Sequence, residues 1–365
     1  MRVLQVVAEL GTGGAEAVVL GLTEGMVARG HRVWVASDHG WRVPLVRRLG
    51  GADHVRIPLA APGPVSLTAA AGRLLAWSPG RPVDLVHAHN VRATLAAAPV
   101  ARMRRAPLLT TVHGLGAEDY PRAVRVLRRL SDLVVAVSAA VADDLEHAGL
   151  PGERIRVVEN AVTLPQTSSG VDPLPGVPAA GPVVLCAARM TRQKRQDLLL
   201  RGWAARRVPG GQLLLAGDGP ERARLESLAR ELDLGSEVRF LGDRDDVPAL
   251  LGRADLLALP SDWEGLPIGV LEAMASRVPV LASSVGGLSD LGSAVRLLPA
   301  EGSEADLVAS WASALDRETT HPQAAADQEE RVAEAEALVF SRFSSTRMVE
   351  AYLGIAERLV TLGYR

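Results

Sequence analysis

Short apolar runs alternate with longer amphipathic stretches along the whole chain. Runs of β-branched and aliphatic residues predict buried strands, and apolar positions spaced three and four apart predict helices. In the first half this pattern predicts strands at 3–7, 32–36, 85–88, 108–112, 133–137 and 156–158, and helices at 15–29, 94–104, 122–130 and 139–148. In the second half it predicts strands at 183–187, 213–216, 238–240, 256–259 and 280–282, a helix from about 268, and two helices at about 324–338 and 346–362. Strands alternating with helices indicate an α/β fold with parallel sheets covered on both faces.

A Pro- and Gly-rich segment divides the chain. With 365 residues the chain is long enough for about two domains. Residues 164–181 have the composition of a linker, which predicts domains at 1–163 and 182–345. The stretch 1–170 carries 19 arginines against 14 acidic residues, a net charge of +5, whereas the remainder carries −7.

Composition excludes several classes of protein. Charged residues at 22% and hydrophobic residues at 48% exclude a disordered chain. The single cysteine, Cys186, excludes a disulfide framework and a cysteine-based zinc site. A net charge of −2 lacks the excess of basic residues that is typical of nucleic-acid-binding proteins. No run reaches the roughly 18–20 apolar residues of a membrane span, and Glu9 with a glycine loop follows the short apolar start, so we expect a cytoplasmic protein.

In the first half, three loops that follow strands carry candidate chemistry. The glycines at 11–14 let backbone N–H groups approach a phosphate or sugar at a helix N-terminus, although for this loop alone a tight strand–helix turn is the favoured interpretation. His87 and His89 resemble a metal pair, but no third ligand lies near them in the sequence, so we interpret them as polar residues at a strand end. His113 follows the next strand, and we interpret it either as a site residue or as a structural histidine.

In the second half, Arg189 and Lys194 follow one strand and suggest an anion contact. Lys194 is the only lysine among 40 basic residues. A solvated basic turn is the alternative for this loop. Asp243 and Asp245 could hold a divalent ion, but we favour Asp246 as the N-cap of a helix.

The clearest signal lies at 260–275. A strand enters a loop with two glycines, and an apolar helix begins near Ile268, whose free N–H groups offer an anion site. Glu264 precedes this helix and Glu272 lies in its early turns, neither where a core would place a carboxylate. Carboxylates accept pairs of hydroxyl hydrogens, which suits ribose or sugar diols.

These residues together resemble the family-4 retaining glycosyltransferases of the GT-B fold, over nearly the whole chain. The matching features, in the family's order, are Gly-Gly-Ala-Glu at 13–16, His113-Gly114, Ser138, Asn160, Arg189 with Lys194, Gly-Asp-Gly-Pro at 217–220, Phe-Leu-Gly at 240–242, Glu264-x7-Glu272 and Gly-Gly at 286–287. The chain departs from the family pattern at Ala161, Arg277 and Ser289-Asp290.

The resemblance implies two Rossmann-like, doubly wound domains facing a cleft, with the helix at about 346–365 crossing back to the first. The first domain would bind the acceptor and the second the nucleotide sugar. Arg189 and Lys194 would hold the diphosphate, Glu272 the ribose and Glu264 the sugar hydroxyls, with His113 beside the transferred sugar. The other donor-side residues would be Gly14, Gly217, Asp243, Leu266, Ile268 and Gly269, and the acceptor-side residues Gly13, Glu16, His89, Ser138 and Asn160. No metal or cofactor is expected.

The reaction implied is transfer of a hexose from a UDP-sugar, with retention, to an envelope glycan or lipid intermediate or to a specialised metabolite. Alternatives are a UDP-sugar epimerase or phosphorylase, and a catalytically silent sugar-nucleotide-binding protein. Independently of the resemblance, Arg122, Arg125, Arg128 and Arg129 follow helical spacing. They suggest weak peripheral contact with the inner face of a membrane, with a solvated basic face as the alternative.

Overall fold

The chain forms two compact units. The computed structural model describes residues 1–162, 181–320 and 322–362, so nearly all of the predicted linker at 164–181 lies outside the described residues. Unit 1 comprises Met1–Ala161 and Ser345–Arg365, and unit 2 comprises Val162–Ser344. No helix in the described ranges is long and apolar enough to cross a membrane.

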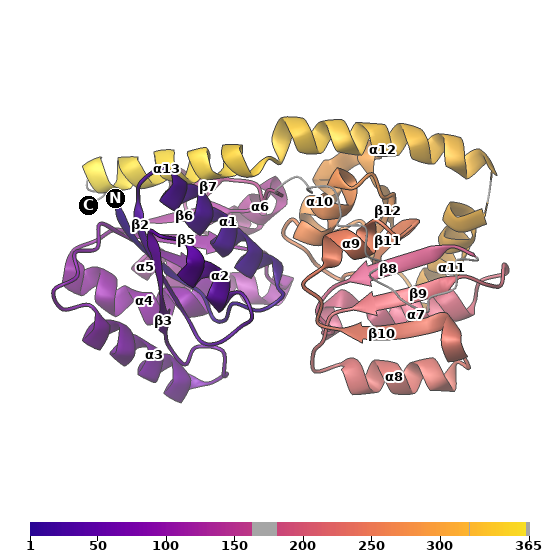
Figure 1. Ribbon diagram of the computed structural model, residues 1–365, viewed down its shortest axis with the longest axis horizontal. Helices are drawn as coiled ribbons and strands as arrows, with labels where there is room; N and C mark the ends of the chain where they lie inside the picture. Colours follow the sequence, from indigo (N-terminus) through magenta and orange to yellow (C-terminus); the bar gives the residue numbers. More distant parts are fainter. Residues whose placement is uncertain (163–180, 321, 363–365) are drawn as a thin grey trace. The chain divides into compact units, whose positions relative to one another are not determined.

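Unit 1 is built on a seven-stranded parallel sheet in the order β3-β2-β1-β4-β5-β6-β7 (Figure 1). Its strands are β1 (Arg2–Val6), β2 (Arg32–Ser37), β3 (Ala52–Arg56), β4 (Leu85–His89), β5 (Leu108–Val112), β6 (Leu133–Ala136) and β7 (Ile155–Val157). Its helices are α1 (Gly14–Ala28), α2 (Val43–Arg48), α3 (Pro64–Trp77), α4 (Asn90–Arg104), α5 (Tyr120–Leu130), α6 (Ala139–His147) and α13 (Ser345–Leu362). One core cluster joins α3 and α4 to one face of β1, β2 and β4.

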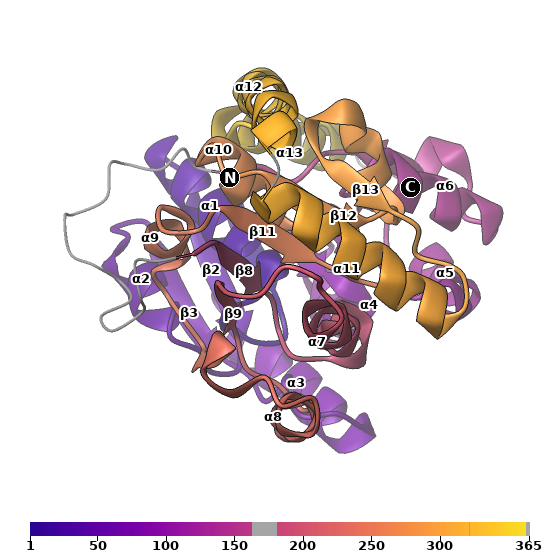
Figure 2. The ribbon, with the colours of Figure 1, turned by 90° about the vertical axis from the view of Figure 1, so that its right-hand side faces the viewer.

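Unit 2 is built on a six-stranded parallel sheet in the order β10-β9-β8-β11-β12-β13. Its strands are β8 (Val183–Ala187), β9 (Gln212–Ala216), β10 (Val238–Gly242), β11 (Leu256–Leu259), β12 (Val280–Ser283) and β13 (Arg296–Leu298). Its helices are α7 (Gln196–Ala204), α8 (Arg222–Glu231), α9 (Val247–Leu251), α10 (Ile268–Ala275), α11 (Glu304–Thr320) and α12 (Pro322–Arg342). One core packs α9, α10 and α12 on one face of the sheet, and a second packs α7, α8 and α11 on the other (Figure 2).

The α/β prediction is therefore confirmed: both sheets are parallel, and helices cover both faces. Strands such as β6, β11 and β12 are buried along their whole length, which explains their unbroken runs of apolar or small residues. The strand order reverses between β1 and β4 in unit 1 and between β8 and β11 in unit 2. Ligands of open α/β sheets bind at such reversals, outside the carboxyl ends of the strands.

Helix α13 packs on α1 within unit 1. A Cβ atom at Gly25 of α1 would come within 2.4 Å of Val349 of α13, so the two helices approach closely because this residue has no side chain. The Tyr352 hydroxyl of α13 lies 3.0 Å from the Thr111 hydroxyl of β5. A segment from the far end of the sequence is thus part of the core of unit 1.

Candidate active site

In unit 2, an ion pair joins the two loops that flank the reversal of strand order. Lys194 lies after β8 and Glu264 after β11, and Lys194 Nζ is 2.5 Å from Glu264 Oε1. The side chains are only 17% and 6% exposed. The pair stands where a doubly wound sheet binds its ligand.

Backbone and side-chain hydrogen bonds fix these two loops to each other. Gln193 Nε2 donates to the Trp263 carbonyl at 2.7 Å, and the Asp262 N–H donates to the Gln193 carbonyl at 2.8 Å. Next to them, the Arg195 guanidinium donates to Asp262 Oδ1 at 3.1 Å. Lys194 is therefore held on a rigid support.

Glu264 is buried although it does not stand at a core position of α10. This residue is 7% exposed, and besides Lys194 it accepts a 2.6 Å hydrogen bond from the Ser261 hydroxyl. Both contacts are made to Oε1. A buried carboxylate needs such partners, and Lys194 and Ser261 supply them. Glu272, in α10, is half-buried.

Close backbone approach explains the glycines around the pair. A Cβ at Gly217, which has φ of 132°, would lie 2.2 Å from the Ala188 carbonyl oxygen. A Cβ at Gly286, with φ of 49°, would lie 1.9 Å from the Glu264 carbonyl oxygen. The loop after β9 thus packs directly on the backbone of the loop after β8, and the loop after β12 on that of the loop after β11.

The cationic residues and α10 complete this edge of the sheet. Arg189 is exposed on the loop after β8, and the side chain of Arg192 on the same loop is 90% exposed. Helix α10 begins at Ile268 with no side-chain cap, followed by Gly269, and Leu266 is buried before it. An uncapped helix N-terminus beside cations favours an anionic ligand.

The aspartates after β10 agree with their prediction only in part, because Asp246 occupies the N-cap position of α9 without capping it through its side chain. Instead its carboxylate accepts two hydrogen bonds from the Arg244 guanidinium, at 2.6 and 2.7 Å, because that charged partner lies only two residues away. Asp243 and Asp245 are exposed, and no group of three or more His, Cys, Asp or Glu among the described residues could hold a metal ion.

In unit 1, the buried His89 and the half-buried His113 belong to a chain of hydrogen bonds at the end of β4 and β5. His113 Nε2 lies 3.1 Å from His89 Nδ1, and His89 Nε2 lies 3.2 Å from Gln5 Oε1. Gln5 Nε2 lies 2.9 Å from the Thr23 hydroxyl, which donates to the Val19 carbonyl at 2.7 Å. The chain runs from the loop after β5, across β1, into α1.

The direction of these hydrogen bonds follows from Thr23. Its single hydroxyl hydrogen goes to Val19, so Thr23 accepts from the Gln5 amide and Gln5 Oε1 accepts from His89 Nε2. Neutral His89 then accepts at Nδ1 from His113 Nε2–H. In this arrangement His113 Nδ1 is a hydrogen-bond acceptor, and it has no partner among the described residues.

Burial keeps these rings neutral near pH 7. It lowers the pKa of His113 to about 4 and that of His87 to about 3, and it lowers the pKa of His89 well below its usual value. His87 shares its environment, with Nε2 2.8 Å from the Thr111 hydroxyl. The backbone N–H of His113 donates to Asn90 Oδ1 at 3.1 Å. The loop carrying His113 is thus held through its ring and its backbone.

The other acceptor-side residues occupy structural positions. The carboxylate of Glu16 folds against Gly13, where a Cβ would lie 2.1 Å from Oε2, and α1 begins at Gly14. Ser138 caps α6 by accepting from the Val141 N–H at 3.2 Å. Asn160 is buried after β7. These residues lie at the carboxyl end of the unit 1 sheet or in the loops that follow its strands.

The sequence pattern did not identify several residues that support the site. Gln5, Asn90 and Ser261 each hold a predicted site residue in place. Gln5 is a polar residue inside a buried strand, which is a detectable signal, whereas Asn90 and Ser261 are ordinary loop or helix-start residues in the sequence.

Two family models match the chain. "Glycosyltransferase Family 4" matches residues 12–165 and "Glycosyl transferases group 1" matches residues 175–331. An uncharacterised glycosyltransferase of Methanocaldococcus jannaschii is 26% identical over 76% of this chain and 78% of its own length. A GDP-mannose-dependent α-(1-6)-phosphatidylinositol monomannoside mannosyltransferase of Mycobacterium tuberculosis is 33% identical over 52% of this chain and 55% of its own length.

Solved structures show the same architecture. Anabaena HepE, crystallised with UDP and glucose, superimposes with a TM-score of 0.81, covering 98% of this chain and 100% of that one at 22% identity. That likeness shows the fold, and the two family models show the relationship. This chain belongs to the family-4 glycosyltransferases of the GT-B fold.

Proposed function

We propose that the protein transfers a hexose from a UDP-sugar to an acceptor hydroxyl with retention of anomeric configuration. The observation that carries this proposal is the buried Lys194–Glu264 pair at the strand-order reversal of unit 2. It fixes a cation where a diphosphate would bind and a carboxylate where sugar hydroxyls would bind.

The leaving diphosphate would be stabilised by two cationic side chains and by backbone N–H groups. Lys194 and Arg189 supply cations, and the N-terminus of α10 at Ile268 and Gly269 supplies backbone N–H groups. Negative charge on the diphosphate grows as its bond to the sugar breaks, so these groups stabilise the transition state more than the bound donor. Glu272 of α10 would accept the ribose hydroxyl hydrogens. Gly217, Asp243 and Leu266 line the same edge on this proposal.

Glu264 would orient the sugar. Its Oε1 is occupied by Lys194 and Ser261, which leaves Oε2 to accept from sugar hydroxyls. The proposed retention uses no covalent nucleophile: the diphosphate departs from the face that the acceptor attacks and takes up the acceptor's proton. Determining the anomeric configuration of the product by NMR tests this step, and an inverted product would contradict it.

Unit 1 would bind the acceptor, with His113 assigned to the transferred sugar. Since His113 Nδ1 is an acceptor, it suits a sugar hydroxyl that donates a hydrogen bond. Gly13, Gly14, Glu16, His89, Ser138 and Asn160 would shape this side.

A donor screen tests the assignment. HepE was crystallised with UDP-glucose, whereas the mycobacterial relative is GDP-mannose-dependent, so UDP-, GDP- and ADP-sugars should be compared by thermal stabilisation and slow hydrolysis. We expect UDP-sugars to stabilise the protein most. Interconversion of the sugar without an acceptor would indicate an epimerase, sugar phosphate formed from inorganic phosphate a phosphorylase, and stabilisation without any turnover a silent binding protein.

Two further properties belong to this proposal. Activity should persist in EDTA, and loss of activity that Mn²⁺ restores would favour Asp243 and Asp245 as metal ligands.

All four arginines predicted to form a basic face (Arg122, Arg125, Arg128 and Arg129) are exposed on α5. We therefore propose that α5 contacts anionic membranes at the cytoplasmic face. Absence of salt-dependent sedimentation with anionic vesicles would contradict that contact.

A further inference from the structure

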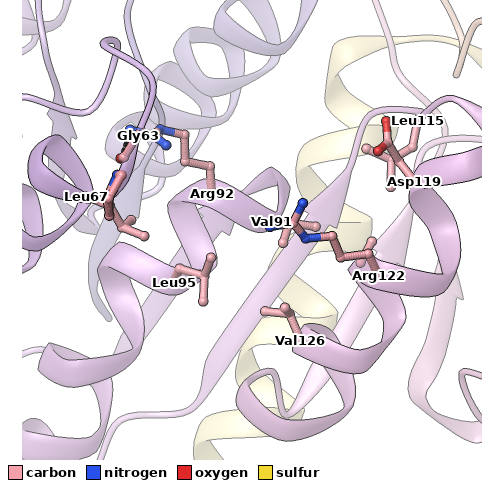
Figure 3. A pocket seen from close by; sticks show the side chains of 11 residues that line it. Gly63, Leu67, Val91, Arg92, Leu95, Leu115, Asp119, Arg122 and Val126 are labelled. Atoms are coloured by element: carbon pink, nitrogen blue, oxygen red, sulfur yellow. Dashed lines mark hydrogen bonds between the residues drawn. The ribbon is translucent and has the colours of Figure 1, made fainter.

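A largely apolar pocket of about 540 Å³ opens in unit 1 between the first turns of three helices (Figure 3). Leu67 of α3, Val91 and Leu95 of α4, and Val126 of α5 form most of its wall, and Leu115 completes it. This volume is in the range of small-molecule sites, which are lined mainly by hydrophobic side chains. Leu95 is 36% exposed, so apolar surface remains accessible to solvent there.

The two arginines of the pocket differ in how they are engaged. Arg92 is committed to the loop before α3: Nε donates to the Leu59 carbonyl at 3.0 Å, and the guanidinium also donates to the Ser66 hydroxyl at 2.6 Å. Arg122 has no ion pair within the described parts of the chain. Figure 3 shows Arg122 directed toward Val91 across the pocket, whereas Asp119 lies beside Leu115. Arg122 is therefore the cation that a ligand can reach.

The charge at the pocket is mainly positive: Arg92 and Arg122 line it, and Asp119 is its one acidic lining residue. Arg125, Arg128 and Arg129 follow Arg122 on α5, all are exposed, and none has an ion-pair partner among the residues described. An apolar wall that carries the unpaired cation Arg122 complements a molecule with a hydrocarbon part and an anionic group. It does not complement a cationic or a purely polar ligand.

The pocket also lies at the edge of the sheet that carries His113. Leu115 of its wall is two residues from His113, and α4, which contributes Val91 and Leu95, begins directly after β4 and His89. A molecule in the pocket would therefore extend from the acceptor side of unit 1.

We propose that this pocket binds the hydrocarbon chain of a lipid-linked acceptor, with a phosphate of that lipid paired to Arg122. This inference rests on the proposed glycosyl transfer, because it names the acceptor class. A phosphate next to the chain would accept charge-assisted hydrogen bonds from the guanidinium. Burial of the chain against Leu67, Leu95 and Val126 would supply the apolar part of the affinity.

The probe is dodecyl phosphate below its micelle-forming concentration, titrated calorimetrically against the full chain. We expect binding to the wild type, with much weaker binding of inorganic phosphate and of dodecyl maltoside. Val126→Trp should abolish binding by filling the pocket, and Leu95→Glu, at an exposed position that spares folding, should weaken it by repelling the phosphate. Arg122→Gln should weaken it about tenfold, the loss of a hydrogen bond to a charged group. Arg125→Gln on the same helix is the matched control and should bind like the wild type.

Two outcomes would overturn the proposal. Equal weakening by Arg122→Gln and Arg125→Gln, with no effect of Val126→Trp, would indicate a basic face that attracts anions without a pocket. Equal affinity for dodecyl maltoside, which has the same hydrocarbon chain but no phosphate, would show that Arg122 does not select an anionic group. Stabilisation by UDP reports on unit 2 separately: if no nucleotide sugar binds but dodecyl phosphate does, the proposed transfer fails while the lipid pocket stands.

Discussion

At the scale of single residues, the candidate site depends on charges that are buried together. Lys194 and Glu264 are the clearest case, because each is the other's main partner in a place that water barely reaches. Breaking a buried pair leaves one uncompensated charge, which costs more than a surface ion pair contributes. The same residues can therefore govern both activity and stability, and the two effects have to be separated.

Replacing Lys194 should lower turnover and stability together. Lys194→Ala and Arg189→Ala should each reduce turnover about a hundred- to thousand-fold, the usual effect of removing one preorganised group that stabilises transition-state charge. Lys194→Ala should also lower the free energy of unfolding by about 3 kcal/mol, because Glu264 remains buried. Steady-state kinetics and urea denaturation measure the two effects.

Matched variants separate these effects. The double variant Lys194→Ala with Glu264→Gln should recover part of the stability and none of the turnover. Arg192→Ala on the same loop, with its side chain 90% exposed, should behave like the wild type. If all three cations give the same kinetic loss, the loop is only a basic surface and the assignment fails.

Gln5 should control the tautomer of His113. Gln5→Met removes the acceptor of the His89 Nε2 hydrogen, so the ring nitrogens of His89 and His113 should show a changed tautomer mixture by NMR. The buried N–H left without a partner should cost about 1–3 kcal/mol of unfolding free energy. Turnover should fall, while UDP affinity, which we assign to unit 2, should not.

Thr23→Val is the control for this chain of hydrogen bonds. It removes only the far partner of Gln5 and leaves Oε1 available to His89, so the tautomer of His113 should change less. An unchanged His113 spectrum in Gln5→Met would show that the chain of hydrogen bonds does not set the tautomer.

At the scale of secondary-structure elements, close helix packing depends on one glycine. Gly25→Ala should destabilise unit 1 by about 1–3 kcal/mol, because the new Cβ would lie 2.4 Å from Val349. Adding Val349→Ala should restore most of that loss. Gly354→Ala in α13 meets nothing within 4 Å and should instead stabilise by up to about 1 kcal/mol. Equal effects of the two glycine substitutions in urea denaturation would argue against the packing explanation.

The buried central strands could be predicted from the sequence, whereas the edge strands β3 and β13 could not. β5, β8 and β11 coincide with their predicted ranges, because a strand covered on both faces is mostly apolar and stands out in the sequence. β3 and β13 were missed: β3 contains Asp53 and His54, and β13 has only three half-buried residues, so neither carries a clear pattern. α3 was missed as well, since only Ala70 and Leu74 of its 14 residues are buried.

The site residues were found through their order along the chain, but their contacts were not. The family motif picks out Lys194 and Glu264 without showing that they bond to each other. That pairing depends on β8 and β11 being neighbours, which follows from the sheet order. In the same way, His89 and His113 become partners only because β4 pairs with β5.

At the scale of the whole molecule, the two units should respond differently to acid. Seven of the eight histidines lie in unit 1, and the eighth is His321. The pKa values of His87, His89 and His113 are lowered by burial, so between about pH 4 and the unfolded pKa of 6.5 the unfolded state binds more protons than the folded state. The stability of unit 1 should therefore fall as the pH drops below 6.5, by up to about 1.4 kcal/mol per pH unit for each histidine.

Urea denaturation at pH 7 and pH 5 would show this difference. Each unit carries three tryptophans, so fluorescence of variants that retain them in one unit only can report on each unit. The transition of unit 1 should move to lower urea at pH 5, and that of unit 2 much less. Equal shifts in the two units would mean that the buried histidines do not dominate the response to acid.

The return of α13 to unit 1 has a consequence for synthesis on the ribosome. Domains generally fold as units while the chain emerges. In the sequence, the two segments of unit 1 are separated by the whole of unit 2. The surface of α1 at Gly25 and the Thr111 hydroxyl therefore have no partner until Val349 and Tyr352 of α13 have been synthesised. Unit 2 is continuous in sequence and can complete its core first. The first segment to be made is thus the last to be finished, and in the interval its uncovered α1 face is the surface that a chaperone would have to protect.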